Sequence, residues 1–331
     1  MAVIADKSPK ADRVATALDT VVLRAEPGQV VCIVCGAVAI TRQVLPNWGS
    51  WCQCTNCGLE FADPLRLLED PTVMFERAYE GEDEDCGMEE FAYRMSIRHA
   101  LLDDPRLWFF NPFAVDEILG FLKSKVPPGG TVLDFGCGLG FFLRVLKREG
   151  FNPVGLDVAK VTVEMNRKEG FEVWHGTLDS MPPDFVKPDA VVALFVLHHL
   201  DDPMGFFGSL RRLWPQAVVA IAEYGQTGSI SAAGYPPRTL HRWNANALAT
   251  AMRRAGYIAT PIEVNSTGTE HLLLRPVRAV MRKTVVMPRI FRMLKAVQRR
   301  ALPKVLKPLQ RPGYTVLSFG EPPEPQAQPI D

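Results

Sequence analysis

VLDFGCGLGFFL, residues 132–143, is the most informative motif in the sequence. It places Gly136, Gly138 and Gly140 between an apolar run and a segment that can form an amphipathic helix. Glycine adopts positive φ angles at no steric cost and lets a ligand approach the backbone. A dinucleotide-binding turn has the pattern G-x-G-x-x-G, and its third glycine would fall where Phe141 stands. The stretch therefore predicts a strand, a ligand-binding glycine turn and a helix, and it disfavours a pyrophosphate ligand.

Apolar runs and helical segments alternate around this turn. Such alternation predicts a doubly wound, mainly parallel α/β sheet that is covered on both faces. Ligands bind these sheets outside the carboxyl ends of the strands, so the residues after each run are the candidate site. The predicted strands are 131–135, 153–156, 171–174, 190–197 and 217–222, with a closing strand at 314–319. The predicted helices are 141–149, 161–169, 204–214 and 245–255.

At these residues the sequence resembles the class I S-adenosylmethionine-dependent methyltransferases, whose first motif has the form D-x-G-x-G-x-G. VGLD then ends the next run at Asp157, where that family carries an acid that hydrogen-bonds both ribose hydroxyls of the cofactor. A carboxylate suits this position because it accepts hydrogen bonds and donates none. The resemblance implies a Rossmann-like methyltransferase fold and S-adenosylmethionine as cofactor. It assigns cofactor contact to Asp134, Phe135, Gly136, Cys137, Gly138, Gly140, Asp157, Val158, Leu178, Asp179 and Phe195.

Two later stretches extend the resemblance. HGTLDSMP contains Leu178 and Asp179, near the segment that contacts adenine in the family. PDAVVALFVLHHLDDP resembles the fourth motif, beside the transferred methyl group, although His198 stands where many relatives have an acid. A hydroxyl or carbon acceptor needs a general base, and neutral histidine accepts a proton near pH 7. The candidate bases are His198, His199 and His241, with Glu223 and Tyr224 as candidate lining of the acceptor pocket.

Five of the seven cysteines lie within residues 32–57. Two C-x2-C pairs, each followed by a glycine, are eighteen residues apart, a spacing typical of zinc ribbons. Four thiolates fill the tetrahedral sphere of Zn²⁺, so the predicted ion is structural. Cys52 is the spare thiol, and Arg42 is the one base between the pairs, which leaves little charge for phosphate contacts. The predicted zinc ligands are Cys32, Cys35, Cys54 and Cys57.

The charges cancel overall but are separated along the chain. The sequence has 37 basic and 37 acidic residues, yet residues 69–90 carry ten acids and one base, and residues 275–311 carry twelve bases and no acid. Part of the basic stretch has the apolar spacing of an amphipathic helix. It predicts an insertion that packs against the sheet and keeps its basic face in solvent. The alternatives are peripheral contact with an anionic membrane and binding of an acidic substrate. Nucleic-acid binding is disfavoured because Phe291 alone offers a ring for base stacking.

The 331 residues suggest about two domains. We predict a flexible leader (1–28), a zinc ribbon (29–65), a helical connector (66–126), a methyltransferase domain (127–320) with a basic helical insertion (275–311), and a disordered tail (321–331). Aromatic side chains of the connector, Tyr79, Tyr93 and Trp108, are expected to pack in the core, with cover of the cofactor as the alternative. The longest apolar runs fall far short of the roughly 20 residues of a membrane-spanning helix. Without an apolar signal sequence the expected compartment is the cytoplasm, with a peripheral membrane contact as an option.

Together these patterns predict S-adenosylmethionine-dependent methyl transfer to the O, C or N atom of a small molecule, glycosyl and lipid-linked acceptors included. The cysteine module ahead of the domain resembles that of some small-molecule methyltransferases, among them sugar C-methyltransferases. Two alternatives stay open. One is an rRNA or tRNA methyltransferase that holds RNA with its ribbon and basic segment, and the other is a non-catalytic adaptor that keeps the fold.

Overall fold

The structure is a computed structural model, and it describes residues 29–45, 48–66, 70–80, 82–83, 86–87, 112–182, 184–226, 236, 239–267 and 310–323. The predicted leader, residues 275–309 of the predicted insertion, residues 324–331, Tyr93 and Trp108 lie outside the described residues.

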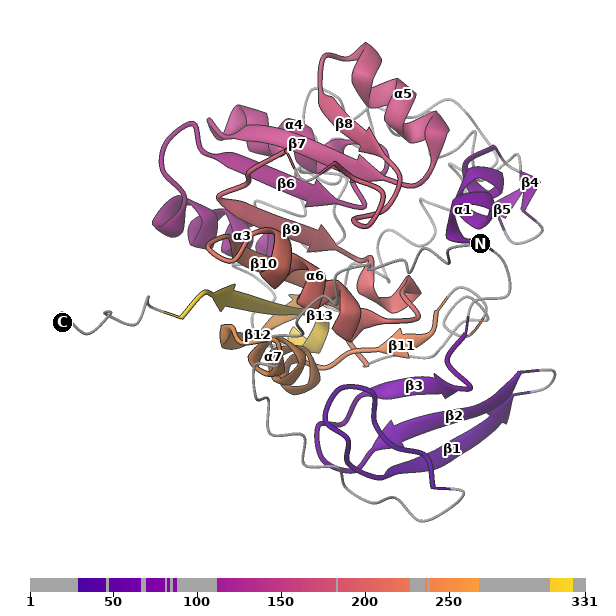
Figure 1. Cartoon of the computed structure of the whole chain (residues 1–331). Helices are drawn as coiled ribbons and strands as arrows, with labels where there is room; N and C mark the ends of the chain where they lie inside the picture. The colour runs from indigo at the N-terminus through magenta and orange to yellow at the C-terminus, as the bar shows by residue number, and fades with distance from the viewer. Residues whose placement is uncertain are drawn as a thin grey trace, which may run out of the picture.

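A seven-stranded sheet forms the centre of the molecule, in the order β12-β13-β10-β9-β6-β7-β8 (Figure 1). The five strands from β10 to β8 run parallel, whereas β13 pairs antiparallel with both β10 and β12. This is the predicted doubly wound, mainly parallel sheet, to which β12 adds a strand that the sequence did not predict. The strands are β6 (Thr131–Phe135), β7 (Asn152–Asp157), β8 (Glu172–His175), β9 (Ala190–Leu194), β10 (Val218–Tyr224), β12 (Ile258–Thr267) and β13 (Gln310–Glu321).

Helices cover both faces of this sheet, as its continuous apolar strands require. Val191 and Ala193 of β9 join a core with α6 and α7, whereas Val192 joins the opposite core with α3 and α4. Successive side chains of a strand point to opposite faces, so a strand buried on both faces has no polar alternation. The helices are α3 (Pro112–Lys125), α4 (Phe141–Arg148), α5 (Lys160–Lys168), α6 (Pro203–Leu213) and α7 (Ala245–Arg254).

The N-terminal ribbon forms a second sheet, in the order β1-β2-β3-β11. Its last strand comes from the opposite half of the chain, and Figure 1 shows β11 reaching from the central domain to the edge of β3. Leu240, next to β11, donates its backbone N–H to the carbonyl of His198 at 2.8 Å, so the segment joins the ribbon to the turn that follows β9. The strands are β1 (Ala39–Leu45), β2 (Gly49–Cys54), β3 (Glu60–Asp63) and β11 (His241–Arg242).

The connector contributes α1 (Pro71–Glu80) and a short hairpin of β4 (Glu82–Asp83) and β5 (Cys86–Gly87). The predicted helical connector is thus helical at both ends of its described part, with two short strands after α1. No helix in the described part of the chain has the length and apolar character needed to span a bilayer.

Two predicted boundaries were wrong at the ends of strands. The run 190–197 was predicted as one strand, but β9 ends at Leu194 and a 3₁₀ turn, η2 (Leu197–His199), follows. The chain leaves the sheet because the carboxylate of Glu223 accepts the backbone N–H groups of Val196 and Leu197 at 2.9 and 2.6 Å. The last strand was predicted as 314–319, but β13 is longer, and it enters both the predicted insertion and the predicted tail.

Candidate functional site

The glycine turn between β6 and α4 allows the backbone to come close to neighbouring groups. Gly136 and Gly140 have φ angles of 72° and 73°, which side chains rarely adopt. A Cβ atom on Gly140 would lie 1.9 Å from Oδ1 of Asn166, and one on Gly136 would lie 2.5 Å from a methyl group of Val196. Both positions therefore require glycine, and the turn is held against α5 and the residues after β9.

Asp157, at the carboxyl end of β7, fixes this turn. Its Oδ2 accepts the N–H of Gly138 at 2.7 Å, and its Oδ1 accepts the N–H of Ala159 and the hydroxyl of Thr162 at 2.9 and 3.2 Å. Burial raises the pKa of Asp157, while these hydrogen bonds lower it. A carboxylate has about four acceptor positions, so Oδ2 retains capacity for a further donor such as a ribose hydroxyl.

Asp134, on the neighbouring strand β6, is 2% exposed, and its Oδ2 has no hydrogen-bond partner among the described residues. Burial and the nearby Asp157 raise the pKa of Asp134 to about 8. A buried polar atom without a partner is rare and often marks a functional site. The sequence did not single out a second such atom, Oδ1 of the buried Asn166, whose side-chain amide donates to the carbonyl of Gly138 at 2.8 Å. Its position within an ordinary helical pattern gave no signal.

The other predicted cofactor residues fall into two groups. Phe135, Cys137 and Leu178 are buried beside the turn or after β8, and the Val158 carbonyl accepts a hydrogen bond from His175. Phe195 follows β9 with a φ of 58° and stacks on Tyr224. Asp179, which follows Leu178, has a side chain that is 83% exposed and lies 3.8 Å from Arg212. The structure thus gathers the buried members of the predicted set at one sheet edge, and the role of Asp179 stays a prediction.

Helix α1 lies over this edge, where Figure 1 shows it beside the end of β8 and α5. The ring of Phe75 meets His199 edge to face at 5.0 Å. The carboxylate of Glu76 accepts the backbone N–H of Lys160, at the start of α5, at 2.8 Å. A Cβ atom on Gly138 would come within 3.0 Å of the Tyr79 hydroxyl, so Tyr79 lies over the glycine turn, and it also packs against the core that contains α3 and α4. The sequence gave no signal for the roles of Phe75 and Glu76.

The three predicted histidines differ in their surroundings. His198 donates from Nδ1 to Glu223 at 2.7 Å, and its side chain is 10% exposed. His199 packs against His198 at 3.8 Å between ring centroids. His241 is fully buried in β11, its Nδ1 donates to the carbonyl of Leu197 at 3.3 Å, and burial lowers its pKa to about 3. His198 and His199 therefore lie together at the sheet edge, and His241 lies behind them.

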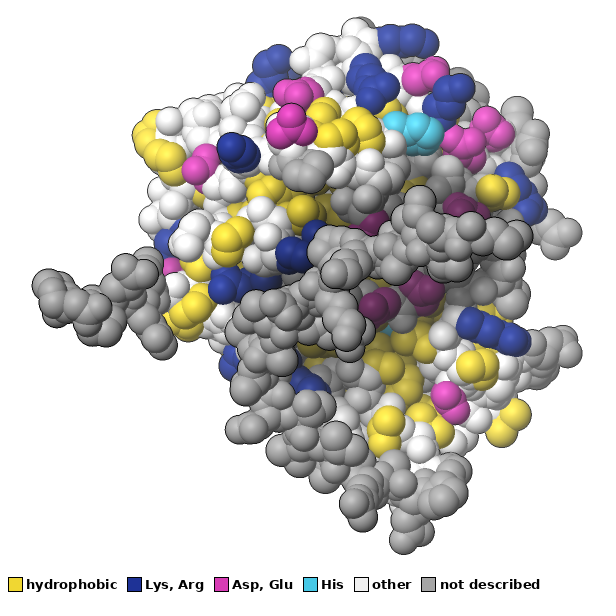
Figure 2. Space-filling view, in the orientation of Figure 1, with side chains coloured by type: hydrophobic (Ala, Val, Ile, Leu, Met, Phe, Trp, Pro, Cys, Tyr) yellow, Lys and Arg dark blue, Asp and Glu magenta, His cyan; other side chains and the backbone are white. Residues whose placement is uncertain are grey.

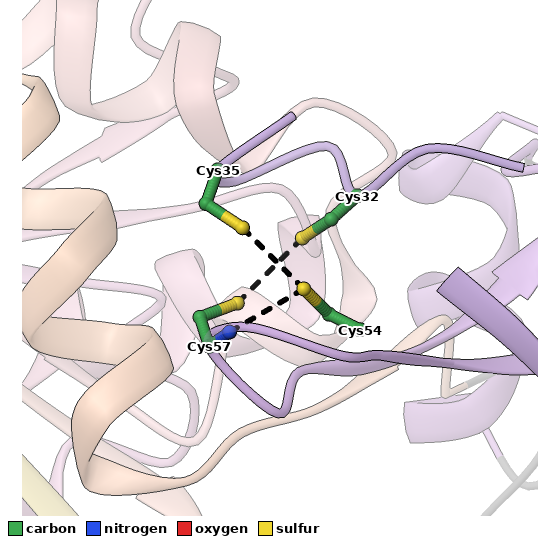
Figure 3. A group of neighbouring side chains, drawn as sticks. All are labelled: Cys32, Cys35, Cys54 and Cys57. Carbon is green, nitrogen blue, oxygen red and sulfur yellow. Dashed lines mark hydrogen bonds between the residues drawn. The ribbon is translucent and has the colours of Figure 1, made fainter. Parts of the chain in front are cut away.

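The four predicted cysteine ligands converge, as Figure 3 shows. Their sulfur atoms all lie within 4.8 Å of one another, and the pairs Cys32–Cys57 and Cys35–Cys54 are 3.6 and 3.4 Å apart. A tetrahedral site with Zn–S bonds near 2.3 Å requires sulfur separations of about 3.8 Å. Hydrogen bonding to Cys57 lowers the pKa of Cys32 to about 5, and the backbone N–H groups of Asn56 and Cys57 point at the sulfur of Cys54. This donor set fits Zn²⁺, and Cys52, which lies in β2, is outside it.

The ribbon is fastened to the central domain through its two cysteine turns. Asn244 and Asn246 donate to the carbonyl of Cys57, and Arg254 donates to the carbonyl of Val34 at 2.7 Å. The Arg242–Glu60 ion pair, at 3.0 Å, joins β11 to β3. On the face of the molecule that Figure 2 shows, the basic side chains of the described residues are scattered and form no single patch.

Comparison with known proteins gives the family of the central domain. Residues 109–260 match the family model of a methyltransferase domain. Over 95 residues the chain is 33% identical to the ribosomal protein L11 methyltransferase of Burkholderia cenocepacia, a match that covers 27% of this chain and 30% of that protein. Over 149 residues it is 28% identical to the ubiquinone biosynthesis O-methyltransferase of Methylocella silvestris, which covers 38% of this chain and 57% of that protein.

Among solved structures, a putative sarcosine dimethylglycine methyltransferase from Galdieria sulphuraria aligns with a TM-score of 0.45 and 15% identity, over 63% of this chain and 86% of that one. The chain spans less than two thirds of the length of either curated relative. The family match and the sheet topology agree on the fold. Residues 109–260 are therefore a methyltransferase domain with a Rossmann-like fold, and the chain adds an N-terminal ribbon whose four cysteines are placed to bind zinc.

Proposed function

We propose that the protein transfers a methyl group from S-adenosylmethionine to a small-molecule acceptor. The observation that carries this proposal is the pair of buried carboxylates, Asp134 and Asp157, beside the glycine turn at the carboxyl edge of the sheet. When bound, S-adenosylmethionine supplies a methyl group on a positively charged sulfur.

The residues present fit such a ligand. Oδ2 of Asp134 is a buried acceptor that has no described donor, and it suits the positively charged methionine end of the cofactor. Asp157 has acceptor capacity for ribose hydroxyls, and Leu178 offers an apolar side chain after β8 for the adenine. The glycine turn brings its backbone close to these groups, because none of its glycines carries a Cβ atom.

The protein's own contribution to the reaction is orientation and the exclusion of water. An in-line displacement gains most of its rate from holding the reacting atoms in line and close together. Phe75 and Tyr79 of α1 cover the edge at which the carboxylates lie, and the histidines after β9 are the candidate proton acceptors. Zinc held by the ribbon would stabilise the fold, since four thiolates leave no open coordination position.

A small-molecule acceptor is supported by two features. The ribbon has little positive charge, which leaves few phosphate contacts for RNA. The match to the ubiquinone biosynthesis O-methyltransferase covers more of this chain than the match to the ribosomal protein L11 methyltransferase. The basic residues 275–309, on which membrane or RNA contact would depend, lie outside the described residues, so both contacts stay predictions.

Methyl-labelled S-adenosylmethionine tests the proposal when it is incubated with three separate acceptor pools: a small-molecule extract, total RNA and ribosomal protein. We expect label to enter the small-molecule pool and Asp157→Ala to abolish the transfer. Label found only in RNA or only in protein would show that the acceptor belongs to that class and is not a small molecule. Binding of S-adenosylhomocysteine without transfer to any pool would favour the non-catalytic adaptor.

A further inference from the structure

We propose that Glu223 and His198 form a proton-accepting pair that serves a hydroxyl group as the methyl acceptor. This inference rests on the proposed methyl transfer. The evidence for it is the set of hydrogen bonds made by the buried carboxylate of Glu223, which was predicted from the sequence only as candidate lining of the acceptor pocket.

The pair lies on the half of the sheet edge that the cofactor carboxylates leave open. Asp134 and Asp157 belong to β6 and β7, whereas His198 follows β9 and Glu223 ends β10, on the other side of β6. The rings of His199 and Tyr224 flank His198 at 3.8 and 5.6 Å between centroids. An acceptor bound over η2 would therefore lie beside the cofactor and against His198.

Glu223 is 0% exposed and uses both of its oxygen atoms. Oε1 accepts the backbone N–H groups of Val196 and Leu197, and Oε2 accepts from Nδ1 of His198 at 2.7 Å. A carboxylate donates no hydrogen bond, so Nδ1 of His198 must carry the proton. The neutral ring then has its lone pair on Nε2, for which no hydrogen-bond partner exists among the described residues. Glu223 thus acts as a positioning residue that fixes both the tautomer and the direction of the ring.

His241 is not equivalent to His198. It is fully buried, its pKa is lowered to about 3, and its Nδ1 donates to the carbonyl of Leu197. It therefore supports η2 from behind and has no path to an acceptor in the site. Leu240 adds a hydrogen bond to the carbonyl of His198, so the turn that carries His198 is held on both sides.

A base fixed in this way suits a neutral acceptor that holds its proton at pH 7. The acceptor oxygen forms a bond to the methyl carbon, the electron pair of the broken S–C bond stays on sulfur, and the hydroxyl proton passes to Nε2 of His198. The imidazolium beside the Glu223 carboxylate then releases that proton to water. Oriented general bases contribute about 10² to 10⁴ in rate.

The test uses the isosteric variant Glu223→Gln in the full chain with S-adenosylhomocysteine bound. The Gln oxygen can accept the N–H groups of Val196 and Leu197, which turns its amide toward Nδ1 of His198. The amide donates, so His198 should switch to the tautomer with its proton on Nε2. Long-range ¹H–¹⁵N NMR of the histidine rings, assigned with His198→Asn, should show a bare Nε2 in the wild type and a protonated Nε2 in Glu223→Gln.

Asp189→Asn is the matched control, because it makes the same chemical change at the opposite edge of the sheet, where Asp189 accepts the N–H of Thr131. It should leave the His198 tautomer unchanged. A wild-type His198 with its proton on Nε2, or an unchanged tautomer in Glu223→Gln, would overturn the pair. In the labelled-methyl assay, Glu223→Gln should reduce kcat by about 10² or more at unchanged cofactor affinity, with the label on oxygen.

Label on a nitrogen or carbon atom, or full activity in Glu223→Gln, would contradict the inference while leaving the proposed methyl transfer intact. Absence of S-adenosylhomocysteine binding by the wild type would instead contradict the proposed function, and the same NMR comparison of the ligand-free proteins would still decide the pair.

Discussion

The ribbon and the carboxyl edge of the sheet are both built from short sequence motifs, but they differ in how the atoms that would hold a ligand are arranged. The four ribbon sulfurs face one another, and the turns around them hydrogen-bond to α7 and to Gln226. At the sheet edge, Oδ2 of Asp134 and Oδ1 of Asn166 are buried without a described partner. A closed donor set indicates a structural role, and unsatisfied buried acceptors indicate a place for a ligand.

Removing the metal from the four-cysteine site of the ribbon should have the largest effect on stability. Cys54→Ser should lose about one equivalent of zinc and lower the melting temperature strongly, because structural zinc sites contribute about 10 to 16 kcal/mol of binding free energy. Cys52→Ser, which removes a buried thiol outside the cluster, should keep its zinc. Metal analysis and calorimetry measure both. Zinc retained by Cys54→Ser would reject the ligand set.

Gly140→Ala should destabilise the glycine turn at the carboxyl edge of the sheet. The new methyl group would meet Oδ1 of Asn166 at a φ of 73°, so we expect a loss of about 2 to 4 kcal/mol in unfolding free energy. Gly150→Ala is the control, because it has a φ of 88° but no atom within 4 Å of the added carbon. It should lose only about 1 to 2 kcal/mol. Equal losses in chemical denaturation would show that the turn is not closely packed.

Asp134→Asn should stabilise the ligand-free protein at high pH. The pKa of this carboxyl is raised to about 8 from 3.8, so the unfolded chain loses the proton at a lower pH than the folded chain. The stability that the protonated carboxyl contributes is complete below about pH 4 and is lost as the pH rises toward 8. The variant escapes this loss, so its melting temperature relative to the wild type should be higher at pH 8.5 than at pH 5. A pH-independent difference would contradict the raised pKa.

Arg242→Met should have the smallest effect. It removes a partly buried ion pair with Glu60 and a hydrogen bond to the carbonyl of Gln226, for an expected loss of about 1 to 3 kcal/mol. Arg253→Met, on exposed α7 surface, should be nearly neutral. Hydrogen exchange would localise the loss to β3 and β11. Exchange that increases at the glycine turn instead would mean that the two regions are not independent.

The sequence predicted what is local. The glycine turn, the five parallel strands and the cysteine pairs depend on residues close together in the chain, and each forms within its predicted stretch apart from the end of β9. Strand β11 was missed because it has two residues and its partner, β3, lies about 180 residues earlier. The end of β9 was missed because the run stays apolar to Leu197, and the hydrogen bonds that bend it come from Glu223 on another strand.

The candidate site shows the same division. The acid and glycine positions were predicted by motif, whereas Asn166 and the cover by α1 result from tertiary packing that no spacing encodes. Asp179 was assigned by its proximity to a motif, and its exposed side chain gives that assignment no structural support.

The buried carboxylates and the glycine turn are proposed to bind S-adenosylmethionine. Calorimetric titration of S-adenosylhomocysteine into the wild type, Asp157→Ala and the control Asp189→Asn measures this binding. We predict one bound equivalent in the wild type and the control, and an affinity lower by about 30-fold or more in Asp157→Ala, the loss of at least one hydrogen bond to a charged group. Indistinguishable affinities of the three proteins, or no binding by the wild type, would contradict the account.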